Sequence, residues 1–183
     1  MTQAEDTSQF EAKLMRPAKS TSDELLAYVV LPKEASQTLP RRGRTTVEGT
    51  INGQSFQATL DPDGQRSHWL QVSQELQAAA GANFGDLVSL EIRPVDEEPE
   101  PEIPADLQEA LAANPGALEV WHDTTTLARV DWIHWIVSAK QAKTRDKRIR
   151  DAIDKLGSGN RRVCCFDQSG VFSKALSAPE AAG

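Results

Sequence analysis

The first half of the chain alternates hydrophobic and polar residues in short runs, a period of two that is typical of strands. The clearest case is RTTVEGTINGQSFQATLDPDG, in which the runs Thr45–Ile51 and Ser55–Leu60 flank the pair Asn52-Gly53. This pair tolerates the positive φ angles of a type I′ turn. The pattern therefore predicts a β-hairpin at this place.

Further strands are expected on both sides of the hairpin, together with one short helix. LLAYVVLP and HWLQV are rich in strand-forming residues, and GDLVSLEIRPV alternates in the same way. SQELQAAAG has the form of a short helix, with Ser73 as its cap and Gly81 as the left-handed residue after it. Five to six short strands and one helix within residues 10–95 predict a small β-barrel domain.

The period changes after a segment in which proline alternates with acidic residues. Residues 96–104, DEEPEPEIP, are expected to be an extended, solvated linker. ADLQEALAAN then predicts a helix, a second helix begins at Pro115 with Asn114 as its cap, and TTTLARVDWIHWIVSAK and TRDKRIRDAIDKL predict two more, the last capped by Thr144. We expect an α+β protein whose helical domain spans residues 105–176 and ends in a short strand.

The helix predicted for TTTLARVDWIHWIVSAK is hydrophobic on two sides. At about 100° per residue, Val130 and Ile133 lie on one side, while Trp132 and Trp135 lie on another. Such a helix is expected to be packed on both sides. The tryptophans are therefore interpreted as packing elements rather than as platforms on which bases stack.

The basic segment SAKQAKTRDKRIRDAIDKL stands out in a chain whose formal charge is −7. Most of its cations project away from the apolar stripe of the helix, so we interpret them mainly as a solvated face. The alternative is a nucleic-acid surface, which the acidic balance of the remaining chain opposes at long range. That surface would consist of Lys140, Lys143, Lys147, Arg148 and Arg150.

Arg145 differs from these cations because it lies four residues before Ile149, on the inward side of the helix. A buried guanidinium needs a carboxylate or several carbonyl groups as partners. One interpretation is an ion pair that holds two helices together. The other is an anion-binding arginine in a cleft, with Trp132 and Arg148 as the further candidate ligand-binding residues.

The chemistry-bearing residues form no familiar catalytic or metal-binding pattern. The chain has 3 histidines and 2 cysteines without HxH, HExxH or CxxC spacing, so no metal and no cofactor are expected. Cys164 and Cys165 are adjacent and are interpreted as buried and inert, although nearby arginines keep a reactive thiolate as an alternative. His134 follows Asp131 by three residues, a spacing that permits a hydrogen-bonded pair.

The N-terminal sequence MTQAEDTSQFEAKLM carries acidic residues where a signal peptide has basic ones followed by an apolar run. Apolar runs in the chain are much shorter than the roughly 18–20 residues of a membrane helix. We therefore expect a cytoplasmic protein without a membrane span.

Two parts of the chain resemble known bacterial families. PRRGRTTVEGTINGQSFQATLDPDGQRSHWLQV and AAAGANFGDLVSLEIRP resemble domain of unknown function 1905. PADLQEALAANPGALEVWHDTTTLARVDWIHWIVSAKQAKTRDKRIRDAIDKL resembles the family described as bacteriocin-protection, YdeI or OmpD-associated. The resemblance covers roughly residues 10–166 and implies a small β-barrel followed by helices. It also implies a loose association with resistance to antimicrobial peptides, and it brings no established catalytic residues.

Three functions follow from these observations. The first is a non-enzymatic cytoplasmic stress or resistance factor that binds a small anionic ligand or a protein partner. The second is nucleic-acid binding through the basic helix. The third is an enzyme that uses a cysteine thiol or the pair of His134 and Asp131. We rank the first ahead of the others because no catalytic constellation is present.

Overall fold

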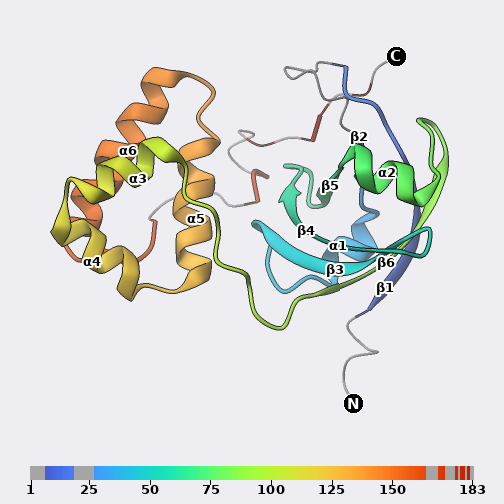
Figure 1. Cartoon of the computed structure of the whole chain (residues 1–183), viewed down its shortest axis with the longest axis horizontal. Helices are drawn as coiled ribbons and strands as arrows, with labels where there is room; N and C mark the ends of the chain where they lie inside the picture. Colours follow the sequence, from blue (N-terminus) through green and yellow to red (C-terminus); the bar gives the residue numbers. More distant parts are fainter. Residues whose placement is uncertain are drawn as a thin grey trace. The chain divides into compact units, whose positions relative to one another are not determined.

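The computed structural model describes residues 7–18, 27–163, 169–171, 176, 178–179 and 181. The chain divides into two compact units, of which the first combines Met1–Glu97 with Ser169–Gly183 and the second is Glu98–Gln168 (Figure 1). No helix among the described residues is long and apolar enough to cross a membrane.

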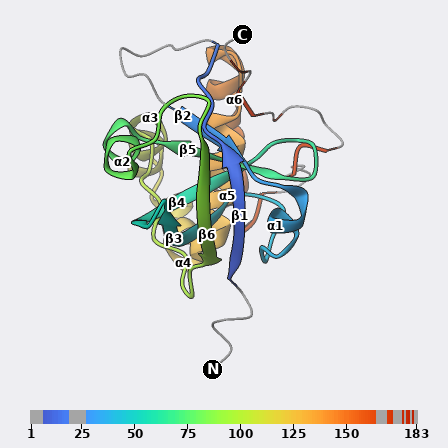
Figure 2. The same ribbon diagram turned by 90° about the vertical axis from the view of Figure 1, so that its right-hand side faces the viewer.

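The first unit is built on one antiparallel sheet with the strand order β1-β6-β3-β4-β5-β2. Its strands are β1 (Ser8–Lys13), β2 (Ala27–Val30), β3 (Thr45–Ile51), β4 (Gln54–Pro62), β5 (His68–Val72) and β6 (Leu87–Pro94). In Figure 2, β1 and β6 run side by side along their length, and the sheet curls away from them. The α+β class and the six strands agree with the sequence-based expectation.

The sheet forms a half-barrel. The prediction of a β-barrel is therefore wrong in one respect, because the sheet is not closed. Within the described residues, the edges β1 and β2 are connected by the isolated bridge of Met15 and Tyr28, which exchange hydrogen bonds of 2.8 and 2.9 Å. β2 has 4 residues and is followed closely by Pro32. Proline lacks the N–H that a longer ladder needs, so β2 is too short to pair along the whole of β1.

The close approach of β3 to β6 requires a glycine in β3. Gly49 faces Ile92 of β6 in the register of the two strands, and a Cβ atom at Gly49 would clash with the backbone oxygen of Glu91. At the end of the same strand, Asn52 and Gly53 have φ angles of 49° and 82°, as the predicted type I′ hairpin requires.

The concave side of the sheet holds the core of the first unit, to which α1 (Lys33–Gln37) contributes Ala35. This helix was not predicted from the sequence. In contrast, α2 (Gln74–Ala80) has the predicted ends, because the Ser73 hydroxyl accepts from the Leu76 N–H at 3.1 Å and Gly81 has a φ of 63°. The main strand residues of the core are Val47, Ile51, Leu60, Leu70, Val72, Val88, Leu90 and Ile92.

The second unit consists of α3 (Ala105–Ala112), α4 (Pro115–Asp123), α5 (Thr126–Val137) and α6 (Ala142–Gly157). Asn114 precedes α4 as expected, but its side chain makes no capping bond. Thr144 was expected to cap the last helix and instead lies inside α6, which begins two residues earlier. The core residues include Leu107, Leu111, Trp121, Trp132, Ile136, Ile149 and Leu156. The expected C-terminal strand falls partly on Cys164–Gln168, which lie outside the described residues.

Candidate functional site

A pocket of about 600 Å³ lies in the first unit, within the size range of small-molecule sites. Three segments of the chain form it. Gln37, Leu39 and Arg42 come from α1 and the loop after it, and Arg66, Ser67 and His68 come from the loop that leads into β5. The C-terminal segment adds Ser169 and Val171.

The imidazole of His68 forms part of the buried floor of the pocket and is 1% exposed. Its Nε2 atom lies 2.9 Å from the carbonyl oxygen of Gly43, and its Nδ1 atom lies 2.7 Å from the hydroxyl of Ser36. Because a carbonyl oxygen can only accept, Nε2 carries the proton, and Nδ1 accepts from the Ser36 hydroxyl. Burial lowers the pKa of His68, so the ring is held in its neutral form.

The contact of Ser36 with His68 has the composition of a serine nucleophile and its base. The Ser36 side chain is 0% exposed, however, and it is not among the residues that line the pocket. A substrate in the pocket therefore cannot reach this hydroxyl. The pair serves to fix the orientation and tautomer of the ring.

The loop before β5 is held in place by Asp63. The Oδ1 atom of Asp63 accepts from the backbone N–H groups of Gln65 at 2.7 Å and Ser67 at 2.9 Å. Between them, Arg66 has a φ of 69°, in the left-handed region that costs a residue with a Cβ atom about 1 kcal/mol. The carboxylate thus stabilises a backbone conformation that places an arginine at the pocket despite this cost.

Arg42 is positioned by the end of α1. Its Nη2 atom donates to the carbonyl oxygens of Ser36 at 2.7 Å and Leu39 at 3.0 Å. These carbonyl groups lie at the C-terminal end of α1, where the aligned backbone dipoles favour a cation. The guanidinium is thereby directed to the same pocket as that of Arg66.

Among the described residues that line the pocket, two carry a guanidinium group and none carries a carboxylate, so the charge of this lining is positive. Within the part of the chain that the structure describes, neither Arg42 nor Arg66 forms an ion pair with a carboxylate. Arg44, by contrast, is neutralised by Asp61 at 2.7 Å. Unneutralised arginines beside a cavity favour an anionic ligand, because guanidinium donates charge-assisted hydrogen bonds to carboxylate and phosphate oxygens.

Arg145, which was predicted from the sequence as a candidate for anion binding, belongs to the second unit. Its Nε and Nη2 atoms donate to Asp106 at 2.8 and 3.1 Å, and this pair joins α6 to α3. The hydrogen bonds from Arg145 hold the pKa of Asp106 below its ordinary value. A ligand-binding role of Arg145 stays a prediction.

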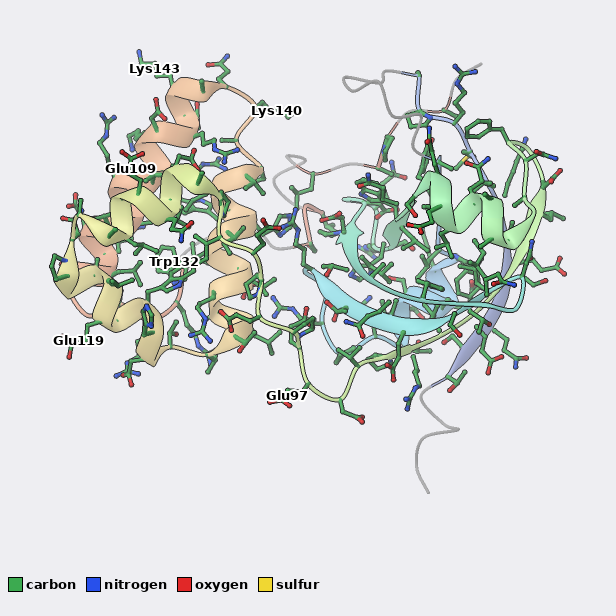
Figure 3. All side chains as sticks on the ribbon, viewed as in Figure 1. Glu97, Glu109, Glu119, Trp132, Lys140 and Lys143 are labelled. Carbon is green, nitrogen blue, oxygen red and sulfur yellow. The ribbon has the colours of Figure 1, made fainter. Side chains whose placement is uncertain are left out.

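The two other predicted ligand-binding residues lie around α5. Trp132 is 0% exposed, and its Nε1 atom donates to the carbonyl oxygen of Arg161 at 3.1 Å. Figure 3 shows Trp132 in the interior of the second unit. Arg148 donates from Nη1 to the carbonyl oxygen of Trp135 at 2.6 Å, and its guanidinium carbon lies 5.6 Å from the centre of that ring. The Arg148 guanidinium therefore covers the end of α5.

The basic residues of the nucleic-acid alternative lie on the surface of the second unit. Lys140, Lys143, Lys147 and Arg150 are exposed, and Figure 3 shows Lys140 and Lys143 pointing outward. Lys147 pairs with Asp151 at 2.9 Å, four residues along α6. Neither the structure nor the comparisons below support nucleic-acid binding.

Of the groups considered for catalysis or metal binding, those that the structure describes form no second site. His134 is 3% exposed within α5, and Cys164 and Cys165 lie outside the described residues. Over the described ranges, no cluster of three or more histidine, cysteine, aspartate or glutamate side chains could hold a metal ion.

Two family models match the chain. Residues 10–92 match domain of unknown function 1905, and residues 100–159 match the family described as bacteriocin-protection, YdeI or OmpD-associated. The resemblance predicted from the sequence is thus confirmed, and a search of curated proteins finds no match.

Most of the pocket lies within the residues that match domain of unknown function 1905, while its wall at Ser169 and Val171 lies beyond both matched ranges. This site was not predicted from the sequence. Two sequence features pointed to it, the closely spaced arginines of PRRGR and the turn DPDGQR. The turn was already explained as the end of the predicted hairpin. The two segments meet because β2 pairs with β5 and the His68 ring contacts Gly43, and such long-range contacts leave no local pattern.

Proposed function

We propose that the protein is a non-enzymatic binding protein that takes a small anionic ligand in the pocket of its first unit. The observation that carries this proposal is the pair Arg42 and Arg66, which lack carboxylate partners in the described chain and line a pocket of about 600 Å³. An exposed cation on a flat surface is solvated by water. Two cations beside a preformed cavity favour a bound anion more strongly, since the low-dielectric walls of the cavity focus their electric field.

The architecture of the pocket also supports binding rather than catalysis. His68 is neutral, with both ring nitrogens hydrogen-bonded to protein atoms, and the Ser36 hydroxyl is inaccessible. General acid–base chemistry needs a titratable group with a free position toward the substrate. The described lining of the pocket offers guanidinium groups, which hold a charge but do not exchange a proton.

The matched family description gives this activity a cellular setting. Because the second unit matches a family named for bacteriocin protection, we propose that ligand binding contributes to resistance against antimicrobial peptides in the cytoplasm. Deleting the gene should lower the concentration of peptide that inhibits growth, and the Arg66→Gln variant should fail to restore resistance. Cell fractionation tests the location, and recovery of the protein outside the cytoplasmic fraction would contradict it.

Calorimetric titration of the full chain with acetate, inorganic phosphate, benzoate and octanoate tests the binding proposal. At least one of these anions is expected to bind with a stoichiometry of one per chain. Arg66→Gln should weaken that binding by roughly tenfold or more, since a charge-assisted hydrogen bond contributes about 1.5–3 kcal/mol. Arg66 is preferred to Arg42 because it makes no hydrogen bond that caps a helix.

Arg16→Gln is the matched control variant. Arg16 is an exposed arginine of the same unit that lies over the ring of Phe84, away from the pocket lining. It changes the net charge as much as Arg66→Gln does, so it reports any long-range effect of charge on binding. If neither variant alters the affinity, or if no anion of the panel binds, the proposal is wrong.

A further inference from the structure

The distribution of polarity within the pocket narrows the ligand class. Resting on the proposed function, we infer that the ligand is a small amphipathic anion, such as an alkyl carboxylate of medium length. Its charged head contacts the arginines at the mouth, and its apolar body enters the pocket. This inference goes beyond anion binding because it excludes small hydrophilic anions as the preferred ligands.

The mouth and the floor of the pocket differ sharply in exposure. Gln37, Arg42 and Arg66 are exposed, so the charged and polar groups that could contact a ligand head lie at the mouth. Leu39 and His68 are 5% and 1% exposed and lie at the floor. A ligand with one charged end can satisfy both regions in one orientation only, with its charge toward solvent.

Among the described residues of the floor, the hydrogen-bond donors are already used. His68 donates from Nε2 to Gly43, Ser67 donates from its hydroxyl to the carbonyl oxygen of Leu31 at 2.7 Å, and the Ser67 N–H donates to Asp63. The Nδ1 atom of His68 is also occupied, by Ser36. A hydroxylated or doubly charged ligand body would lose its bonds to water there without replacement, at a cost for each buried polar group.

An apolar body suits the same surface. The Leu39 side chain, the face of a neutral imidazole and the half-buried Val171 provide the carbon atoms that line the interior. Each methylene group that leaves water strengthens binding by about fourfold. The pocket of about 600 Å³ is also much larger than a bare phosphate or acetate ion needs.

Calorimetric titrations with octanoate, acetate and inorganic phosphate at one ionic strength test the inference on the full chain. Octanoate is expected to bind at least tenfold more tightly than acetate and phosphate. Arg66→Gln should weaken octanoate and acetate by the same factor, because both use the carboxylate head. Val171→Thr, which replaces a methyl group with a hydroxyl group of similar size, should weaken octanoate by roughly threefold and leave acetate unchanged.

The outcomes separate this inference from the function on which it rests. If phosphate or acetate binds as tightly as octanoate and depends on Arg66, anion binding stands and the amphipathic ligand is wrong. If no anion shows dependence on Arg66, both fail. If octanoate binds but ignores Arg66→Gln and Val171→Thr alike, it binds elsewhere, which also overturns the inference. Circular dichroism of each variant confirms that the fold is retained in these comparisons.

Discussion

Among single residues, His68 combines the deepest burial with the most hydrogen-bonding constraint at the pocket. Desolvation is the largest cause of its lowered pKa, and Arg42 acts in the same direction. The hydrogen bond to Gly43 and the charges of Asp61 and Asp63 act in the opposite direction. The neutral ring is therefore a property of the folded state, and it links the stability of the first unit to pH.

The sign of this link follows from proton binding in the two states. The unfolded chain has a histidine pKa of about 6.5, and the folded state has a lower one. At pH values between these two pKa values, the unfolded chain therefore binds more protons than the folded state. The contribution of His68 to stability is present above about pH 6.5 and declines as the pH falls below it. Urea denaturation at pH 7.5 and pH 5.5 measures the decline, which should be smaller in His68→Gln. An equal decline in both proteins would contradict the assignment to His68.

At the scale of elements, the close approach of the C-terminal segment to the loop before β5 sets one wall of the pocket. A Cβ atom at Gly64 would clash with the backbone oxygen of Leu176, and one at Gly170 would lie 2.6 Å from the Cβ atom of Leu176. Both glycines also have positive φ angles, of 76° and 74°. Small residues on both sides thus allow this segment to bring Val171 to the pocket.

Gly64→Ala is expected to displace the C-terminal segment, destabilise the first unit and weaken octanoate binding. Gly53→Ala is the matched control, because Gly53 has a similar φ of 82° but open space around its Cβ position. The control should cost roughly 1 kcal/mol from its backbone conformation alone and leave the affinity unchanged. Urea denaturation and calorimetry measure both effects. Equal losses in the two variants would show that the contact with Leu176 contributes nothing.

The same elements show which features were predictable. The hairpin at Asn52-Gly53 and the ends of α2 follow from local backbone chemistry, so the sequence predicted them. The five-residue helix α1 has no full period of hydrophobic residues and was missed. The pocket was missed because it combines residues far apart in the chain. Arg145 was singled out from periodicity, and its partner Asp106 could not be chosen among the many acidic residues nearby.

At the scale of the whole molecule, the chain leaves the first unit after Glu97 and returns to it at Ser169. The second unit is therefore a continuous segment with its own core, in which Leu107, Leu111 and Trp132 are at most 1% exposed. Hydrogen bonds within the segment also connect its helices, such as those of Arg145 with Asp106. A segment with a separate core and internal polar contacts meets the physical requirements of an independent domain.

Residues 98–168 expressed alone are expected to fold. Their circular dichroism should show helix, and heating should give one cooperative transition, because the core of α3 to α6 is complete within the segment. Trp132→Ala should lower the stability of this segment by about 3–5 kcal/mol, since the indole is fully buried. Leu127→Ala is the control, because Leu127 is 41% exposed in the same helix. A disordered segment would mean that its core needs the first unit, and the two units would then have to be treated as one cooperative fold.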